Sequence, residues 1–244
     1  LFLGFSAGMP LLLIFSSLSL WLREAGIDRS AVTFFSWAAL GYSFKFVWSP
    51  LVDRLPLPIL TKLLGRRRSW LLLSQVMIVS SIVWMALTDP TKSDFSLQVM
   101  AVAAVLLGFS GATQDIVIDA YRIESASQKM QGALSSMYIT GYRIAMLVAG
   151  AGSLYLASFF GSEVYNVEVW KKVYLIMAGL MLVGILTTIF LPEPKIKRQI
   201  SLLNSNDQFR FLISFIIALI IFIFTYSQLV PPLTLESPIQ KFLF

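Results

Sequence analysis

Residues 105–122 read VLLGFSGATQDIVIDAYR, and this stretch decides the fold. It begins with a continuous run of apolar residues, as found in the hydrocarbon core of a bilayer, and it then contains Gln114, Asp115 and Asp119. Because Asp115 and Asp119 are four residues apart, they share one face of a helix. A carboxylate at membrane depth is costly unless it has a partner or borders a water-filled cavity. The stretch therefore predicts a transmembrane helix that carries functional acids.

The composition of the whole chain is typical of a membrane protein. Of the 244 residues, 57% are hydrophobic and only 13% are charged, whereas soluble domains carry roughly 25% charged residues. The sequence has neither Cys nor His, so we expect no metal site and no cofactor, and any proton relay must use Asp or Glu. The net charge of +6 is explained by basic cytoplasmic loops, so we expect a lipid bilayer and no nucleic acid as partner.

Seven apolar segments are long enough to cross a bilayer core, which takes about 20 helical residues. These segments are continuously apolar and do not alternate, which favours helices over a strand barrel. We therefore expect an all-α membrane protein. The predicted spans are 1–22, 31–49, 69–88, 97–120, 132–158, 173–191 and 211–230.

The segment 192–210, PEPKIKRQISLLNSNDQFR, is polar and punctuated by proline. It predicts a cytoplasmic linker that follows a six-span half in 1–191. Residues 211–244 would then hold the first span of an incomplete second half, whose missing part is an expected partner. Lysine and arginine concentrate in the loop 50–68 and after spans four and six, so these loops and the N-terminus are expected in the cytoplasm.

Several charged side chains are predicted to lie within the spans. At about 1.5 Å per residue, Arg143 lies roughly 16 Å deep, near the midplane, and Lys45 lies about 21 Å from the outer edge. A midplane guanidinium favours a cavity where it can bind a carboxylate; the alternative is a structural contact, for instance with Tyr138. Lys45 and Asp115 lie at comparable depth, so they either form an ion pair that gates or contact a ligand. Tyr42, one turn before Lys45, is expected to face the same cavity.

Two motifs lie at the ends of predicted spans. The sequence SPLVDR at 49–54, followed by GRRR at 65–68, resembles the signature between spans two and three of the major facilitator superfamily. It departs from that signature at Ser49, where glycine is usual, and in the ten-residue spacer 55–64. The sequence LPEP at 191–194 resembles the motif that closes span six in the same superfamily.

A narrower resemblance joins four stretches. The sequences FKFVWSPLVDR at 44–54 and LGRRRSWL at 64–71, residues 110–121, and GYR at 141–143 together resemble the AmpG-like muropeptide permeases. The resemblance implies a six-helix major facilitator half plus a seventh helix, in the bacterial inner membrane. It further implies a proton-driven carrier that imports anhydromuropeptides from periplasm to cytoplasm for peptidoglycan recycling. Because the acidic core of span four is similar in eukaryotic acetyl-CoA transporters, a carrier of that kind is the alternative.

The resemblance also implies roles for single residues. In the superfamily, the acid of the span two–three signature and an acid at the cytoplasmic end of span four pair with nearby arginines and hold the outward-open state. Carried over, this gating lock joins Asp53, Asp119 and one of Arg54 or Arg66. Asp119 is accordingly expected to have a structural role at the membrane interface.

An anionic amino-sugar ligand needs a buried cation, so we assign substrate binding to five residues of spans two, four and five. Burial favours the neutral form of a carboxylic acid, so proton coupling is assigned to Asp115. Two alternatives remain open: a membrane enzyme such as an acyltransferase, for which no catalytic pattern is present, and a fragment that does not transport. The substrate-binding candidates are Arg143, Lys45, Tyr42, Gln114 and Tyr138.

Overall fold

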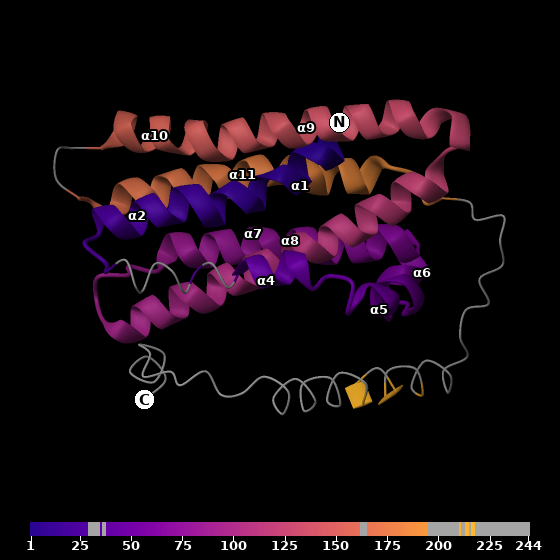
Figure 1. Cartoon of the computed structure of the whole chain (residues 1–244), viewed down its shortest axis with the longest axis horizontal. Helices are drawn as coiled ribbons and strands as arrows, with labels where there is room; N and C mark the ends of the chain where they lie inside the picture. Colours follow the sequence, from indigo (N-terminus) through magenta and orange to yellow (C-terminus); the bar gives the residue numbers. More distant parts are fainter. Residues whose placement is uncertain are drawn as a thin grey trace. The chain divides into compact units, whose positions relative to one another are not determined.

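The computed structural model describes residues 1–28, 35, 38–161, 165–194, 210, 213, 214, 216 and 217. The chain divides into two compact units, Leu1–Lys197 and Arg198–Phe244, and the elements below belong to the first. Every regular element in the described part of this unit is helical (Figure 1). This confirms the all-α expectation for the described residues.

Five helical runs are long and apolar enough to cross a membrane: Phe2–Glu24, Arg66–Leu87, Asp94–Ser125, Gln128–Phe160 and Val167–Phe190. They confirm predicted spans one, three, four, five and six, although the run Asp94–Ser125, which is span four, continues five residues beyond its predicted end at residue 120. The seventh predicted span, 211–230, lies almost entirely outside the described residues.

Two of the five runs are not regular α-helices throughout. The first consists of α1 (Phe2–Leu12), the π-helical turn η1 (Leu13–Leu18) and α2 (Ser19–Glu24). The run Gln128–Phe160 consists of the 3-10 turn η3 (Gln128–Met130), α9 (Gln131–Leu147), the π-helical turn η4 (Val148–Gly152) and α10 (Ser153–Phe160). The other three are α7 (Arg66–Leu87), α8 (Asp94–Ser125) and α11 (Val167–Phe190).

The second predicted span, 31–49, is wrong in its last part. Its first residues lie outside the described part of the chain, but the helix α4 (Ala38–Ser43) ends at Ser43. The chain then turns through Phe44–Trp48 before α5 (Ser49–Arg54) begins, and α6 (Leu60–Leu64) follows. Pro50 lies in the first turn of α5; because it has no N–H to bond to the carbonyl of Phe46 and its ring would clash with that carbonyl, one continuous helix is broken here.

Small residues line the contact between α1 and α9. A methyl group added at Gly4 or Gly8 would collide with the backbone carbonyl of Tyr138 or Tyr142, respectively. At Gly141 it would collide with the carbonyl of Leu1. Small residues allow helix backbones to approach closely in lipid, so the spacing of Gly4 and Gly8 marks the α1–α9 interface.

Polar groups gather at the two ends of the described bundle. Arg66, Arg67 and Arg68 begin α7 at one end, which we call the arginine end. Trp21 near the end of α2 and Trp170 near the start of α11 lie at the other, which we call the tryptophan end. In Figure 1 the labels α5 and α6 mark the arginine end, and α2 and α10 extend toward the tryptophan end.

Candidate functional site

Asp115 of α8 is the acid at the centre of the candidate site. Asp115 is only 8% exposed, and its Oδ2 atom lies 3.9 Å from the Nζ atom of Lys45. Its other oxygen, Oδ1, is buried and makes no hydrogen bond within the described part of the chain. Lys45 lies in the turn after α4, and 38% of its side chain is exposed. The structure therefore brings these two residues together as a long ion pair with spare bonding capacity.

Three tyrosines lie within electrostatic range of Asp115. Tyr42 comes from α4, whereas Tyr138 and Tyr142 come from successive turns of α9. The ring centroids of Tyr138 and Tyr142 are 6.0 Å apart. The hydroxyl group of Tyr42 is buried without a hydrogen-bond partner among the described residues, and it lies against Gly111 of α8. The acid is thus placed among one ammonium and three phenol groups.

Tyr142 was not among the residues selected from the sequence. The available signal was its spacing, since Tyr142 follows Tyr138 by four residues and so shares its helix face. Gly141 and Ala145, which flank this face, are buried against α1, and their packing fixes the rotation of α9 about its axis. This rotation directs both tyrosine side chains toward α8.

Arg143 follows Tyr142 on an exposed part of α9. It is exposed, and it follows the buried Gly141 by two residues, or about 200° around the helix axis. Its guanidinium interacts electrostatically with Tyr142. Ser136 and Thr140 are also exposed on the same side of α9, so Arg143 ends a polar stripe on a membrane-spanning helix.

Gln114 is separated from the acid that follows it. It is fully buried, and its Oε1 atom accepts a 2.6 Å hydrogen bond from the hydroxyl of Ser6 in α1. Consecutive helical residues point about 100° apart, so Gln114 faces the α1 contact while Asp115 faces Lys45. This geometry gives Gln114 a packing contact with α1, while its Nε2 atom is buried without a hydrogen-bond partner among the described residues, so the ligand contact of Gln114 stays a prediction.

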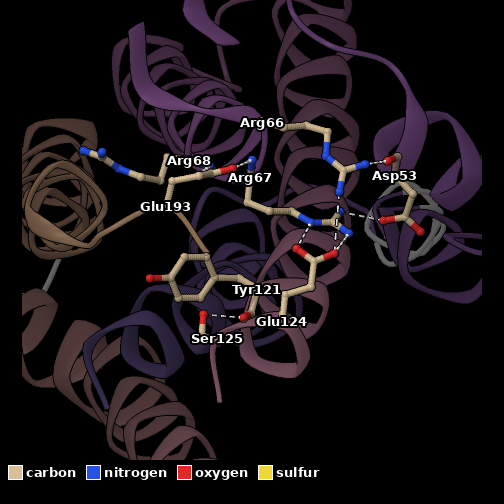
Figure 2. A network of polar contacts seen from close by, with 8 residues as sticks. All are labelled: Asp53, Arg66, Arg67, Arg68, Tyr121, Glu124, Ser125 and Glu193. Atoms are coloured by element: carbon tan, nitrogen blue, oxygen red, sulfur yellow. Dashed lines mark hydrogen bonds and ion pairs between the residues drawn. The ribbon is translucent and has the colours of Figure 1, made fainter. Parts of the chain in front are cut away.

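The arginine end holds a second polar group, which we call the arginine cluster: Asp53, Arg66, Arg67 and Glu124 (Figure 2). The Arg67 side chain is 5% exposed; its Nη1 atom donates to Asp53 Oδ1 at 2.6 Å and its Nε atom to Glu124 Oε2 at 2.9 Å. Arg66 donates to the backbone carbonyl of Asp53, and its Nη2 atom lies 3.6 Å from Glu124 Oε1. Arg67 therefore bridges α5 and α8.

The membership of this cluster differs from that of the predicted gating lock. Asp53 and Arg66, which were assigned to the lock, belong to this cluster, whereas Asp119 pairs with Arg122 of its own helix at 3.3 Å. The acid of α8 that meets the arginines is Glu124, because α8 runs on to Ser125. Arg54 lies in the last turn of α5, while Arg67 supplies the bridge. The sequence signal for Glu124 was its position as the last acid before the loop.

The LPEP motif is bound to the same end of the bundle. Glu193 accepts hydrogen bonds from the backbone amides of Arg67 at 2.9 Å and Arg68 at 3.1 Å, at the N-terminus of α7. The hydroxyl of Tyr121 donates to the carbonyl of Pro192 at 2.7 Å. A carboxylate is favoured at a helix N-terminus, where free amides and the helix dipole face it. Figure 2 shows Glu193 and Tyr121 beside the arginine cluster.

Comparison with known proteins agrees with this architecture. The chain is 40% identical over 197 residues to "Putative transporter AmpG 4" of Rickettsia felis, a match that covers 81% of this chain and 45% of the relative. It is 37% identical over 194 residues to "Anhydromuropeptide permease" of Escherichia coli K12, covering 80% and 37% of the two chains. A Haemophilus influenzae protein without assigned function is 40% identical over 199 residues, covering 81% and 43%.

The matched region spans less than half the length of each of these relatives. The family model described as Major Facilitator Superfamily matches residues 1–240, nearly the whole chain. The described residues carry five apolar helices that can span a membrane, and among them no group of three or more acids is arranged to hold a metal ion. The chain is a multi-pass membrane protein and belongs to the major facilitator superfamily.

Proposed function

We propose that this chain is the N-terminal half, with the first span of a second half, of a proton-coupled carrier for anhydromuropeptides. The carrier moves its substrate from periplasm to cytoplasm across the bacterial inner membrane. The observation that carries the proposal is the pair of buried Asp115 and part-exposed Lys45 in a chain similar to an anhydromuropeptide permease. The pair supplies an acid for a proton and a cation for an anionic ligand within one site.

The coupling follows from the charge balance of this pair. When Asp115 is ionised, Lys45 is attracted to it at 3.9 Å. When Asp115 accepts a proton, the ammonium group loses its counter-charge and becomes available for a carboxylate of the substrate. Lys45 is well suited to this exchange, since 38% of its side chain is exposed and its stem is flexible. Proton binding at Asp115 and anion binding at Lys45 therefore favour each other.

The remaining ligand contacts are assigned to α4 and α9. Tyr42, Tyr138 and Tyr142 present aromatic rings and hydroxyl groups beside the acid, and such groups suit a sugar that has both apolar faces and hydroxyls. Arg143 is exposed next to Tyr142, and its planar guanidinium suits a second carboxylate of the peptide.

The arginine cluster is proposed to act as the gate at the cytoplasmic end. Its ion pairs join α5, α7 and α8, and they hold the arginine end closed while the site is open to the other side. In this revised lock, Arg67 and Glu124 act with Asp53 and Arg66, and Asp119 lies outside it.

The test is uptake of labelled anhydromuropeptide into vesicles from cells that express the native gene. Asp115→Asn should abolish uptake driven by a pH gradient but leave exchange of substrate across the membrane. Arg143→Ala removes a charge-assisted contact of about 1.5–3 kcal/mol, so the KM should rise about ten- to a hundredfold. Asp94→Asn, at the exposed start of α8, is the matched control.

Two results would count against the proposal. Unchanged uptake in both Asp115→Asn and Arg143→Ala would show that the site is assigned wrongly. Competition of the labelled substrate by acetyl-CoA, but not by unlabelled anhydromuropeptide, would favour the alternative carrier.

A further inference from the structure

Two π-helical turns lie side by side in the first and fifth spans. η1 (Leu13–Leu18) contacts η4 (Val148–Gly152), and each interrupts an otherwise α-helical run. Such turns account for well under 1% of residues in globular proteins and are frequent at functional sites. A simple membrane crossing needs no π turn, so two in contact at the same level indicate a common role.

Two buried serines connect the turns. The Oγ atoms of Ser17 and Ser153 are 2.6 Å apart, and Ser17 Oγ donates to the carbonyl of Ala149 at 2.8 Å. Ser153 Oγ also lies 2.6 Å from the carbonyl of Ala149 and 2.8 Å from that of Gly150. Each hydroxyl has one proton, so the bonds of Ser153 are alternatives. The contact can therefore exchange partners without leaving a buried polar group unpaired.

The local sequence also favours bending at this level. Pro10 lies inside α1, one turn before η1, and it interrupts the helical hydrogen-bond ladder. Gly150 and Gly152 lie within η4, and glycine weakens helical stiffness. A methyl group added at Gly152 would meet only ordinary contacts at 3.8 Å and beyond, so no close packing requires glycine there.

Beyond the turns, α2 is fixed to α11. The Trp21 and Trp170 rings are stacked with centroids 5.8 Å apart and planes 4° apart. The indole of Trp170 donates to Glu24 at 2.8 Å, and that of Trp21 donates to the Tyr165 hydroxyl at 3.1 Å. These contacts hold α2 against α11 at the tryptophan end.

The segment α10 contacts α11 through a cation–π pair at its last residue, in which Lys172 Nζ lies 5.9 Å from the centroid of the Phe160 ring, and α10 borders an open cavity. The cavity has a volume of about 760 Å³ and lies between α2, α10 and α11. Leu20 and Glu24 line it from α2, Ala157 and Ser158 from α10, and Trp170 from α11. The cavity therefore provides space into which α10 can move while α2 and α11 stay in place.

We propose that η4 is a hinge on which α10 swings into this cavity, with the Ser17–Ser153 contact as its latch. The movement changes the width of this cavity at the tryptophan end. The inference rests on the proposed transport function for its purpose, because a carrier needs a gate opposite the arginine cluster. The movement itself can be measured without any substrate.

The test uses the absence of cysteine from the sequence. Leu20→Cys is combined with Ala157→Cys, or separately with Ser158→Cys, and the protein is oxidised in native membranes. A disulfide requires Cα atoms within about 7 Å, so its formation reports closure of the cavity. We expect both pairs to form disulfides as well as to react with long cross-linkers.

Variants of the hinge and of the latch give opposite results. Gly152→Ala should slow disulfide formation about fivefold, since alanine favours regular helix over a flexible turn. Gly179→Ala, which also meets no close contact but lies in the regular helix α11, should have no effect. Ser153→Ala should speed disulfide formation, whereas Ser81→Ala, a buried serine bonded only within α7, should not.

Two results would overturn the hinge. In the first, both cysteine pairs react with long cross-linkers but form no disulfide on oxidation. In the second, disulfides form at equal rates in all variants. Failure of the proposed function gives a different pattern. Disulfide rates that respond to Gly152→Ala, together with no uptake of anhydromuropeptide, would retain the hinge and reject the substrate.

Discussion

The bridge between Arg67 and Glu124 offers the most direct quantitative test. We predict that a double-mutant cycle with Arg67→Gln and Glu124→Gln gives a coupling free energy of about 2–3 kcal/mol. A hydrogen bond to a charged group contributes about 1.5–3 kcal/mol. Arg67 Nε and Nη2 both donate to the Glu124 carboxylate, but the side chain of Glu124 remains 17% exposed, which lowers the sum of the two bonds.

In each single variant, the charged residue that remains keeps a different partner. Glu124→Gln leaves the Arg67 guanidinium with Asp53, whose side chain is 41% exposed. Arg67→Gln leaves Glu124 with Arg66, whose nearest nitrogen is 3.6 Å from the carboxylate. Because each remaining charge keeps a partner, each single variant should cost less than the 3–5 kcal/mol typical of an isolated buried charge.

The assay is unfolding of the purified protein in detergent micelles, followed by helix signal against denaturant. The matched control is the pair Asp119–Arg122, in which 45% and 24% of the two side chains are exposed. A partly exposed pair one turn apart on a helix contributes at most about 0.5 kcal/mol and is screened by salt. A coupling below about 0.5 kcal/mol for Arg67–Glu124, or a larger one for Asp119–Arg122, would refute the assignment of Glu124 to the arginine cluster.

Three further predictions concern packing, the LPEP motif and the chain by itself. Gly8→Ala should destabilise the bundle by about 1–3 kcal/mol in the same unfolding assay. The added methyl group would collide with the α9 backbone and would lie 3.0 Å from Ala145 Cβ. Gly179→Ala, which has open space around it, is the control. Glu193→Gln should lower the free energy of unfolding by about 1 kcal/mol. The glutamine amide keeps one acceptor oxygen but removes the negative charge at the start of α7. A full loss of stability would contradict this prediction. Proteoliposomes that contain only these 244 residues should take up no labelled anhydromuropeptide. A carrier of this superfamily binds its substrate between two halves. Measurable uptake would disprove the need for a second half.

Features that depend on local sequence and on bilayer thickness were predicted well. Five spans were located because about 20 continuous apolar residues must cross a fixed core as helix. Lys45 and Asp115 were expected at similar depth, and the structure places them 3.9 Å apart, although Lys45 lies in the turn after α4 and not in the continuous helix that the depth estimate assumed.

Features that depend on helix rotation or on where a helix ends required the tertiary structure. Gln114 and Asp115 are neighbours in sequence, yet packing of α8 turns one toward Ser6 and the other toward Lys45. Glu124 meets the arginines because α8 continues to Ser125, whereas Asp119 is left with Arg122. The apolar pattern alone determined that this chain crosses the membrane as helices. A long apolar segment is stable in lipid, and its backbone polar groups must then be hydrogen-bonded within the segment. Which acid meets which cation was decided only in the packed bundle, since it depends on the angle and register between helices.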